Sequence, residues 1–276
     1  MTIQVEEFGT GVGYYKGASR GWGGSGKTTT GIIIGNGLKH YLKLPGKVAM
    51  FDTETGGEYV NAISKNGDKR LGVVGTGQNI VGCKARTLGE LLEFIPWCVS
   101  HDIAFLLIDS ISHVWTEVQR SMLAQINAVR ESQRKNAIAK LEFQHMEALK
   151  TKWATFTDAF LNSKLHIHFC GRAANIWNFV ENEDGKKELQ KSGEKMKAEG
   201  EMEYEPALLL DMERVPNDKE IIHRCTVLKD KFGRMNGAQM DDPQFEFFMP
   251  FVKMLTLGAV NAVDVTRQTD MKISEE

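Results

Sequence analysis

Compact apolar runs alternate with amphipathic stretches along the first 110 residues of the chain. Lys47–Asp52 and Ile103–Asp109 are mainly apolar and end in an aspartate, a pattern typical of buried parallel strands. Residues 28–42 and 87–100 carry apolar side chains at helical spacing, and residues 14–19 predict a short, weakly apolar strand. The alternation of strands and helices predicts an α/β fold with a mostly parallel central sheet flanked by helices.

A long segment without glycine or proline, residues 97–170, contains the strand that ends at Asp109 and then predicts two amphipathic helices. Apolar residues recur there at three- and four-residue steps, and the pattern breaks near residues 134–136. This long helical segment is followed by a further strand over residues 164–171. We expect the helices to pack on the sheet with a solvated charged face, although that face could instead touch a partner or DNA.

The rest of the chain is less regular. Residues 181–205 are highly charged and interrupted by glycines, and they predict either a mobile loop or an exposed hairpin. Three later apolar segments predict strands that extend the sheet, namely residues 207–214, 221–231 and 245–257. The last dozen residues predict a frayed tail. No repeat or linker divides the sequence, so we expect a single domain over residues 1–276 with its core at about residues 13–257.

Composition and charge restrict the class of protein only broadly. Hydrophobic residues make up 42% and charged residues 25% of the 276 residues, and the formal net charge of −2 gives no global basic field. The four cysteines lack a C-x-x-C pair and predict free thiols in a reducing compartment: Cys83, Cys98, Cys170 and Cys225. A polar, acidic start and the lack of a run of about 20 apolar residues predict no signal peptide and no membrane span. We therefore expect a cytoplasmic protein.

One segment fits the phosphate-binding motif G-x-x-x-x-G-K-[ST] at every fixed position: Gly21-Trp22-Gly23-Gly24-Ser25-Gly26-Lys27-Thr28. Its glycines let backbone N–H groups turn toward phosphate oxygens, and the following helix aims its positive end at the anion. Lys27 would lie between the β- and γ-phosphates, and the Thr28 hydroxyl would bind Mg²⁺. The predicted ligands are ATP and Mg²⁺, and the predicted nucleotide contacts are Gly21, Gly23, Gly24, Ser25, Gly26, Lys27, Thr28 and Thr29. No motif identifies the base, so the preference for ATP stays open.

Hydrolysis of a phosphate needs one acid for the metal and a second group for the attacking water. Asp109 ends the most hydrophobic strand, where its carboxylate would hold Mg²⁺ through water; a helix cap is the alternative. Ser110 rather than a glutamate comes next, so the base must come from elsewhere. Glu54 follows the preceding apolar strand, and the carboxyl ends of parallel strands meet at one rim. We expect Glu54 to orient water on the γ-phosphate, with a loop acid of no catalytic role as the alternative. Asp52 is either a metal partner or the cap of the turn at residues 56–57.

These motifs resemble those of the RecA-like ATPases, especially the compact phage-encoded members linked to single-strand annealing and recombination. F-D-T-E at residues 51–54 is similar to the family's catalytic glutamate segment, and L-L-I-D-S at residues 106–110 is similar to its Walker B strand. The resemblance covers roughly residues 13–251 and implies a RecA-like P-loop core, with the chain in the host cytoplasm if it is phage-encoded. It also implies a homo-oligomer, either a ring or a filament.

The same resemblance implies roles for three later cations. Arg172 corresponds to a sensor of the γ-phosphate, and a surface salt bridge is the alternative. Hexameric relatives carry a K-x-K or K-x-R element that reaches the neighbouring subunit's γ-phosphate, which implies that role for Lys229 and Lys231. An ordinary pair of edge-strand lysines is the alternative.

The leading hypothesis is therefore a Mg²⁺-dependent ATPase that acts on single-stranded DNA in phage recombination or replication. A bound strand would need a basic groove and stacking aromatics, for which Trp115, Trp153 and Trp177 are available, although core positions are the preferred interpretation. A nucleotide-switched regulator or scaffold of protein partners is the alternative from another class, and a ring helicase or helicase loader is the closest neighbour. A small P-loop kinase would need an arginine-rich lid, which the sequence does not show.

Overall fold

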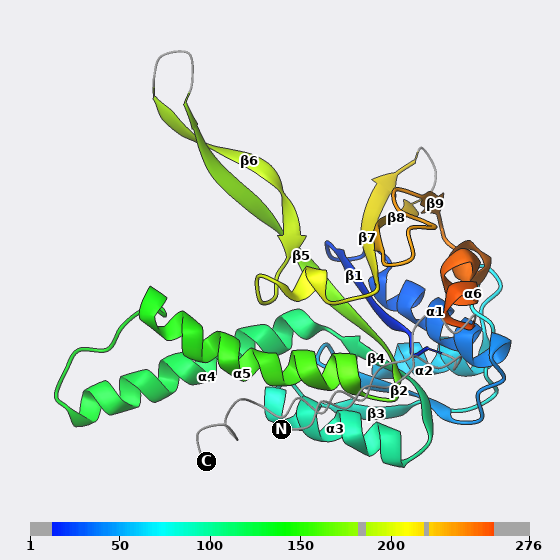
Figure 1. The fold of residues 1–276 in the computed structure, drawn as a ribbon, viewed down its shortest axis with the longest axis horizontal. Helices are drawn as coiled ribbons and strands as arrows, with labels where there is room; N and C mark the ends of the chain where they lie inside the picture. Colours follow the sequence, from blue (N-terminus) through cyan, green and yellow to red (C-terminus); the bar gives the residue numbers. More distant parts are fainter. Residues whose placement is uncertain (1–12, 182–185, 218–220, 257–276) are drawn as a thin grey trace, which may run out of the picture.

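A mixed β-sheet forms the centre of the molecule, and helices cover both of its faces (Figure 1). The computed structural model describes residues 13–181, 186–217 and 221–256. Within these residues the sheet has nine strands, in the order β3-β2-β4-β5-β1-β7-β8-β9, with β6 paired to β5 outside this path. The strands are β1 (Lys16–Gly21), β2 (Lys47–Asp52), β3 (Val81–Lys84), β4 (Ile103–Asp109), β5 (His166–Glu181), β6 (Lys187–Met196), β7 (Leu208–Pro216), β8 (Ile221–Asp230) and β9 (Gln239–Asp241).

The six strands from β3 to β7 in this order run parallel, and β8 and β9 continue the sheet antiparallel. Every residue of β4 is buried, as expected for a strand covered on both faces. The prediction of an α/β fold with a mostly parallel sheet flanked by helices is thus confirmed.

Two helical layers enclose the sheet. The helices are α1 (Lys27–Tyr41), α2 (Gly57–Asn66), α3 (Leu88–Ser100), α4 (Ile111–Ser132), α5 (Phe143–Asn162) and α6 (Met249–Thr256), with short 3-10 turns η1 (Met202–Tyr204) and η2 (Phe245–Phe248). Side chains of α1, α2 and α6 form one core cluster with the sheet, and side chains of α3, α4 and α5 form the other. The long helical segment after β4 is α4 and α5, and its break falls between residues 132 and 143.

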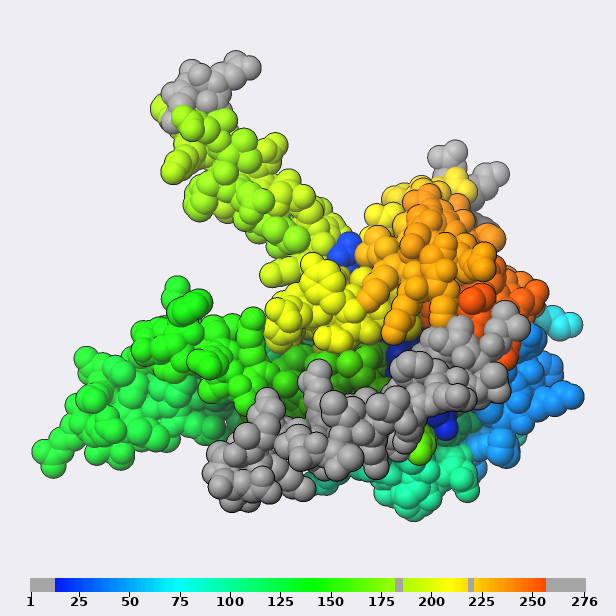
Figure 2. Space-filling view, in the orientation of Figure 1, coloured from blue at the N-terminus to red at the C-terminus, as the bar shows by residue number. Residues whose placement is uncertain are grey.

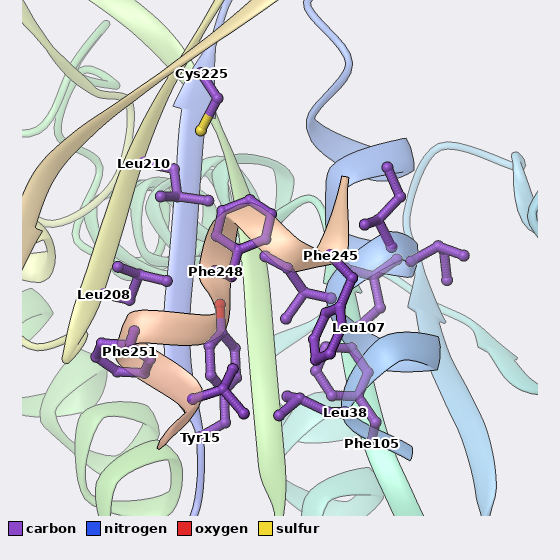
Figure 3. Close-up of a cluster of buried hydrophobic side chains, with 14 of the residues drawn as sticks. Tyr15, Leu38, Phe105, Leu107, Leu208, Leu210, Cys225, Phe245, Phe248 and Phe251 are labelled. Atoms are coloured by element: carbon purple, nitrogen blue, oxygen red, sulfur yellow. The ribbon is translucent and has the colours of Figure 1, made fainter. Parts of the chain in front are cut away.

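Aromatic rings fill much of both cores. On the α1 face, Phe248 and Phe251 lie beside Tyr15 between α6 and the strands (Figure 3), and all three are buried. On the other face, Trp115 of α4 meets Trp153 of α5 edge to face at a centroid distance of 5.0 Å. Burial of one such side chain stabilises the fold by roughly 1.5–3 kcal/mol, so these rings hold the layers together.

The prediction of a strand over residues 245–257 is wrong, because this segment forms η2 and α6. Its buried residues recur at helical spacing: Phe245, Phe248, Phe251, Val252 and Leu255. Pro250 lies in the first turn of α6, where its missing N–H has no partner to lose. A short apolar run cannot be assigned to a strand or a helix by hydrophobicity alone. Strands β7 and β8, in contrast, match the predicted strands over residues 207–214 and 221–231.

Within the charged segment 181–205, residues 187–196 form one strand of an exposed hairpin, and η1 lies in the part that follows. Beyond the core, β5 continues to Glu181 and pairs antiparallel with β6 to form a projecting arm, defined here as residues 173–181 and 187–196 (Figure 2). The outer ends of α4 and α5 also project, since the last buried residue of α4 is Val118 and the first of α5 is Leu149 (Figure 1). The predicted packing of these helices on the sheet therefore holds for their inner halves only. The predicted frayed tail lies outside the described residues.

Tryptophan and cysteine positions divide between surface and interior. Trp115 and Trp153 are in the core as expected, but the core assignment of Trp177 is wrong, since this side chain is 51% exposed on the arm. All four cysteines are free; Cys83 is half-buried, and the other three are buried.

Among the described helices, none combines the length and apolar character needed to cross a membrane.

A histidine is buried in a polar network beneath the β1–α1 loop. His168 of β5 lies between the hydroxyl groups of Tyr15 and Ser19, each 3.0 Å from a ring nitrogen. Burial lowers the pKa of His168 to about 3, so the ring is neutral in the fold. The unfolded chain, with a histidine pKa near 6.5, binds a proton that the folded chain excludes. The contribution of His168 to stability is therefore complete above pH 6.5 and is lost as the pH falls toward 3.

The substitution His168→Asn should make stability less sensitive to acid. Between pH 6 and pH 4, the free energy of unfolding of the native chain should fall more steeply than that of the variant, by about 1.4 kcal/mol per pH unit. Urea unfolding at several pH values measures both slopes, and His40→Asn at an exposed position of α1 is the control. Parallel slopes for the native chain and His168→Asn would contradict the assignment.

Candidate functional site

The carboxyl ends of the central parallel strands bring the predicted site residues to one rim of the sheet. The register pairs Asp52 of β2 with Asp109 of β4, and Asp109 with Cys170 of β5. On the other side of β5, Gly21 of β1 pairs with Arg172. The loop after β1 and the two aspartates therefore lie side by side, as the sequence predicts.

The glycine-rich loop connects β1 directly to α1. Gly24 and Gly26 have φ angles of 73° and 87°, in the left-handed region that favours glycine. The helix begins at Lys27, so the loop lies at its positive end, which attracts anions. Gly21 ends β1, Gly23 and Ser25 lie in the loop, and Thr28 and Thr29 lie in the first turn of α1. This strand, loop and helix order is the context that the phosphate-binding motif requires.

The Lys27 ammonium lies over the loop. It donates hydrogen bonds to the carbonyl oxygens of Gly21 and Trp22 at 2.9 and 2.8 Å, and it lies 3.3 Å from the Ser25 hydroxyl. Burial lowers the pKa of Lys27 below its ordinary value. A cation held here by neutral oxygens alone can exchange these partners for a more strongly binding anion such as phosphate.

The Asp109 carboxylate and the Thr28 hydroxyl form the best candidate for a magnesium site. Thr28 donates a hydrogen bond of 2.5 Å to Asp109. Burial raises the pKa of Asp109 to about 6, and the Thr28 bond opposes this rise. Within the described residues, no group of three or more His, Cys, Asp or Glu side chains could hold a metal by itself. Magnesium does not need such a group, because it usually takes one or two protein oxygens together with phosphate and water. The hard oxygen donors present here fit that chemistry, and the neighbouring Ser110 hydroxyl is buried with no hydrogen-bond partner among the described residues.

Asp52 caps the turn that follows β2. Its carboxylate accepts hydrogen bonds from the backbone N–H groups of Glu54, Gly56 and Gly57, at 2.9, 3.3 and 2.8 Å. Of the two predicted roles, the cap of residues 56–57 is the one that these contacts describe. The turn leads into α2, whose N-cap is Gly56 and which the sequence analysis missed.

Thr53 joins the ends of β2 and β4. Its N–H and its hydroxyl both donate to the Asp109 carbonyl oxygen, at 2.7 and 3.0 Å, and its hydroxyl accepts from the Ser110 N–H at 2.7 Å. The His113 ring lies 2.8 Å from the same hydroxyl. Thr53 therefore fixes the distance between the segment that carries Glu54 and the strand that carries Asp109.

Glu54 points into a cluster with Arg172 and His113, and burial lowers the pKa of His113 below its ordinary value. Arg172 donates two hydrogen bonds to its carboxylate, at 3.2 and 3.0 Å, and His113 of α4 lies 3.7 Å away. The Arg172 backbone N–H in turn donates to the Ser112 hydroxyl at 2.8 Å. The Glu54 side chain remains 36% exposed, so water can reach it. The structure thus brings Arg172 and Glu54 together, two residues that are far apart in the sequence.

Lys229 and Lys231 lie away from this rim. In the sheet register, Lys229 of β8 pairs with Leu209 of β7, and Leu209 pairs with Ala18 of β1. Ala18 lies three residues before the end of β1. At about 3.3 Å per residue, this level is roughly 10 Å below the loop. Lys229 donates to the Tyr204 carbonyl oxygen, and Lys231 follows the end of β8 with an exposed side chain. The two lysines are not part of the cluster formed within one chain.

Sequence reasoning missed Thr53, Ser112 and His113. Thr53 lies within the F-D-T-E segment that the sequence analysis identifies, so the sequence itself indicates that Thr53 is close to the site. Ser112 and His113 lie in the first turn of α4, where the helical pattern carries no sign of a site.

No protein-family model matches the chain, and no curated protein sequence matches it either. The chemistry of the site therefore has to be argued from its own residues.

The substitution Thr53→Val should destabilise the fold although it preserves the shape of the side chain. It leaves the buried Ser110 N–H without its partner, and we expect the free energy of unfolding to fall by about 2 kcal/mol. Thr151→Val is the matched control, since the Thr151 hydroxyl bonds an exposed helix carbonyl; its expected change is within about 0.5 kcal/mol. Urea denaturation measures both values, and equal effects of the two substitutions would contradict the bridging role of Thr53.

Proposed function

We propose that the protein is a Mg²⁺-dependent ATPase. The observation that carries the proposal is the convergence of Lys27, Thr28, Asp109 and Glu54 at one rim of a parallel sheet. An anion-binding loop at a helix N-terminus, a hydroxyl–carboxylate pair and a water-accessible acid are the parts that phosphoryl transfer to water requires.

Each residue has a distinct task in this proposal. The loop N–H groups and Lys27 bind the phosphate chain, and Thr28 with Asp109 holds the metal. Bound Mg²⁺ neutralises negative charge on the β- and γ-phosphates. Glu54 orients the attacking water and accepts hydrogen bonds from it. Arg172 keeps the Glu54 carboxylate in place and is close enough to exchange this contact for a γ-phosphate oxygen.

We further propose that the core is RecA-like and that it acts as a homo-oligomer. The catalytic acid after β2, the metal acid at the end of β4 and the serine that follows it support the first part. The second part is supported by Lys229 and Lys231, which lie at the end of β8, roughly 10 Å below their own loop and outside its reach. If these lysines contact a γ-phosphate, the nucleotide must belong to a neighbouring subunit in a ring or filament.

Single-stranded DNA is the proposed partner, and the arm is its proposed contact. Trp177, which is 51% exposed, lies opposite Lys191, and Phe179, which is 73% exposed, lies opposite Leu189. Directly opposed side chains share one face of a hairpin, so this face combines stacking surfaces with a lysine. The arm begins directly after Arg172, which connects it to the candidate catalytic cluster.

A regulator acting on protein partners is the second candidate. The observation that favours it is the pair of projecting helices, whose outer ends expose Val129 at 55% and Phe143 at 94%. Segment 181–205 also holds nine acids against five lysines, which weakens the electrostatic case for DNA.

Steady-state ATP hydrolysis tests the catalytic assignment. Glu54→Gln should lower turnover by about 100-fold or more while ATP still binds, because the variant loses the carboxylate that orients water and keeps the phosphate-binding loop. Lys27→Ala should lose both binding and turnover. Glu58→Gln, on the exposed side of α2, is the matched control and should keep native turnover. Native turnover in Glu54→Gln would contradict its role as the base.

The double substitution Trp177→Ala with Phe179→Ala tests the partner. Fluorescence anisotropy with a labelled single-stranded oligonucleotide should show affinity reduced by about 10-fold or more, because each stacked base contributes about 1–3 kcal/mol. Phe143→Ala, an exposed aromatic on α5, is the control. Unchanged DNA affinity, or no stimulation of hydrolysis by DNA in the native chain, would instead favour the protein-directed regulator.

A further inference from the structure

The end of β7 and the start of β8 lie against the glycine-rich loop, on the side away from the two aspartates. A Cβ atom added to Gly26 would lie 3.2 Å from three atoms of the His223 side chain. A Cβ atom added to Gly24 would lie 4.0 Å from an Arg214 guanidinium nitrogen. Figure 1 shows β7 and β8 beside the end of β1, and the sheet order places β7 next to β1. Two side chains that the phosphate motif does not include therefore border the loop.

Both side chains continue buried apolar rows of the α1 face. Leu208, Leu210 and Met212 alternate along β7 toward the rim, and Arg214 is the next position in that row. On β8, Val227 and Cys225 lead to His223 in the same way. The register places Arg214 directly opposite His223, so the two side chains share one face. Each row is apolar inside the core and becomes polar only at the loop.

His223 is held in position, whereas Arg214 has no such partner. The Asp242 carboxylate accepts a hydrogen bond from the His223 backbone N–H at 3.0 Å and lies 3.2 Å from the ring Nδ1. The ring Nε2 is therefore left for another group. Arg214 is exposed, and its side chain makes no hydrogen bond or ion pair with any described residue. Arg224, one position along β8 from His223, points to the other face and pairs with Asp241 at 2.7 Å.

The sheet order determines which end of a nucleotide these residues can meet. Under the proposed function, the acids and the arginine that serve the γ-phosphate and metal lie at or just after the carboxyl ends of β2, β4 and β5, all on one side of β1. β7 and β8 lie on the opposite side of β1. If the terminal phosphate of a bound triphosphate lies among the acids, the nucleoside end therefore extends across the loop toward β7 and β8.

We propose that Arg214 and His223 form the nucleoside side of the site and contact the base and ribose of the bound nucleotide. Planar guanidinium and imidazole groups stack on aromatic bases, and both donate hydrogen bonds to ring nitrogens or hydroxyl groups. This inference rests on the proposed nucleotide site and adds the recognition element for which the sequence carries no motif.

Calorimetric titration of the full chain with two ligands, Mg²⁺-ATP and inorganic tripolyphosphate with Mg²⁺, tests the proposal. Tripolyphosphate carries the phosphate chain without a nucleoside. Arg214→Ala and His223→Leu should each weaken ATP binding by about 10-fold and leave tripolyphosphate binding within about 2-fold. Leucine retains packing volume against Gly26, so the loop keeps its support. Arg224→Ala is the control on the opposite face and should bind both ligands as the native chain does.

Three outcomes would overturn the proposal. Native ATP affinity in the double variant of Arg214 and His223 would remove both residues from the site. A parallel loss for ATP and tripolyphosphate would make them phosphate contacts and not nucleoside contacts. If the native chain binds neither ligand, the nucleotide site itself is absent and the proposed function fails. In the first two outcomes the native chain binds both ligands, so the two kinds of failure can be told apart.

Discussion

The hydrogen bond between Thr28 and the buried carboxylate of Asp109 is the interaction on which the rest of the site depends. A carboxylate in this position is costly unless it has partners, and burial already raises its pKa to about 6. The side chain of Asp109 takes its partner from α1, and its backbone oxygen takes two hydrogen bonds from Thr53 after β2. One residue thus aligns the loop, α1 and β2 with β4. Glu54, which immediately follows Thr53, owes its position to the same contacts.

The parts of the site that were predictable from sequence are those encoded by contiguous residues. The loop from Gly21 to Thr28 is a continuous motif, and the acids that end β2 and β4 each follow a recognisable apolar run. The rule that parallel strands share a carboxyl rim then brings them together without further information. Arg214 and His223 could not be found in this way. Their place depends on the register of β7 and β8 against β1, which is set by packing between segments about 190 residues apart.

The incorrect predictions have two different physical causes. The apolar character of residues 245–257 predicts a strand, although the buried positions of this segment follow the period of a helix. A core position is the prediction for Trp177 because large aromatic residues are usually well buried. Whether this residue is buried depends on where β5 leaves the sheet. Apolar residues continue past Arg172, for example at Ile176, Trp177 and Phe179, so the sequence carries no local sign of that point.

Strand β5 connects the rim to the arm as one continuous element. Up to Arg172 it is hydrogen-bonded to β1, and up to Cys170 also to β4, whereas from Ala173 onward its partner is β6. The inner half is held by ladders on both of its sides, whereas the outer half is paired on one side only, with β6. The contacts of Arg172 with Glu54 and Ser112 lie at this point, and Glu194 of β6 bonds the loop residue Trp22 at 3.3 Å. A bound phosphate that changed the partners of Arg172 or the shape of the loop would therefore act on both strands of the arm at its base.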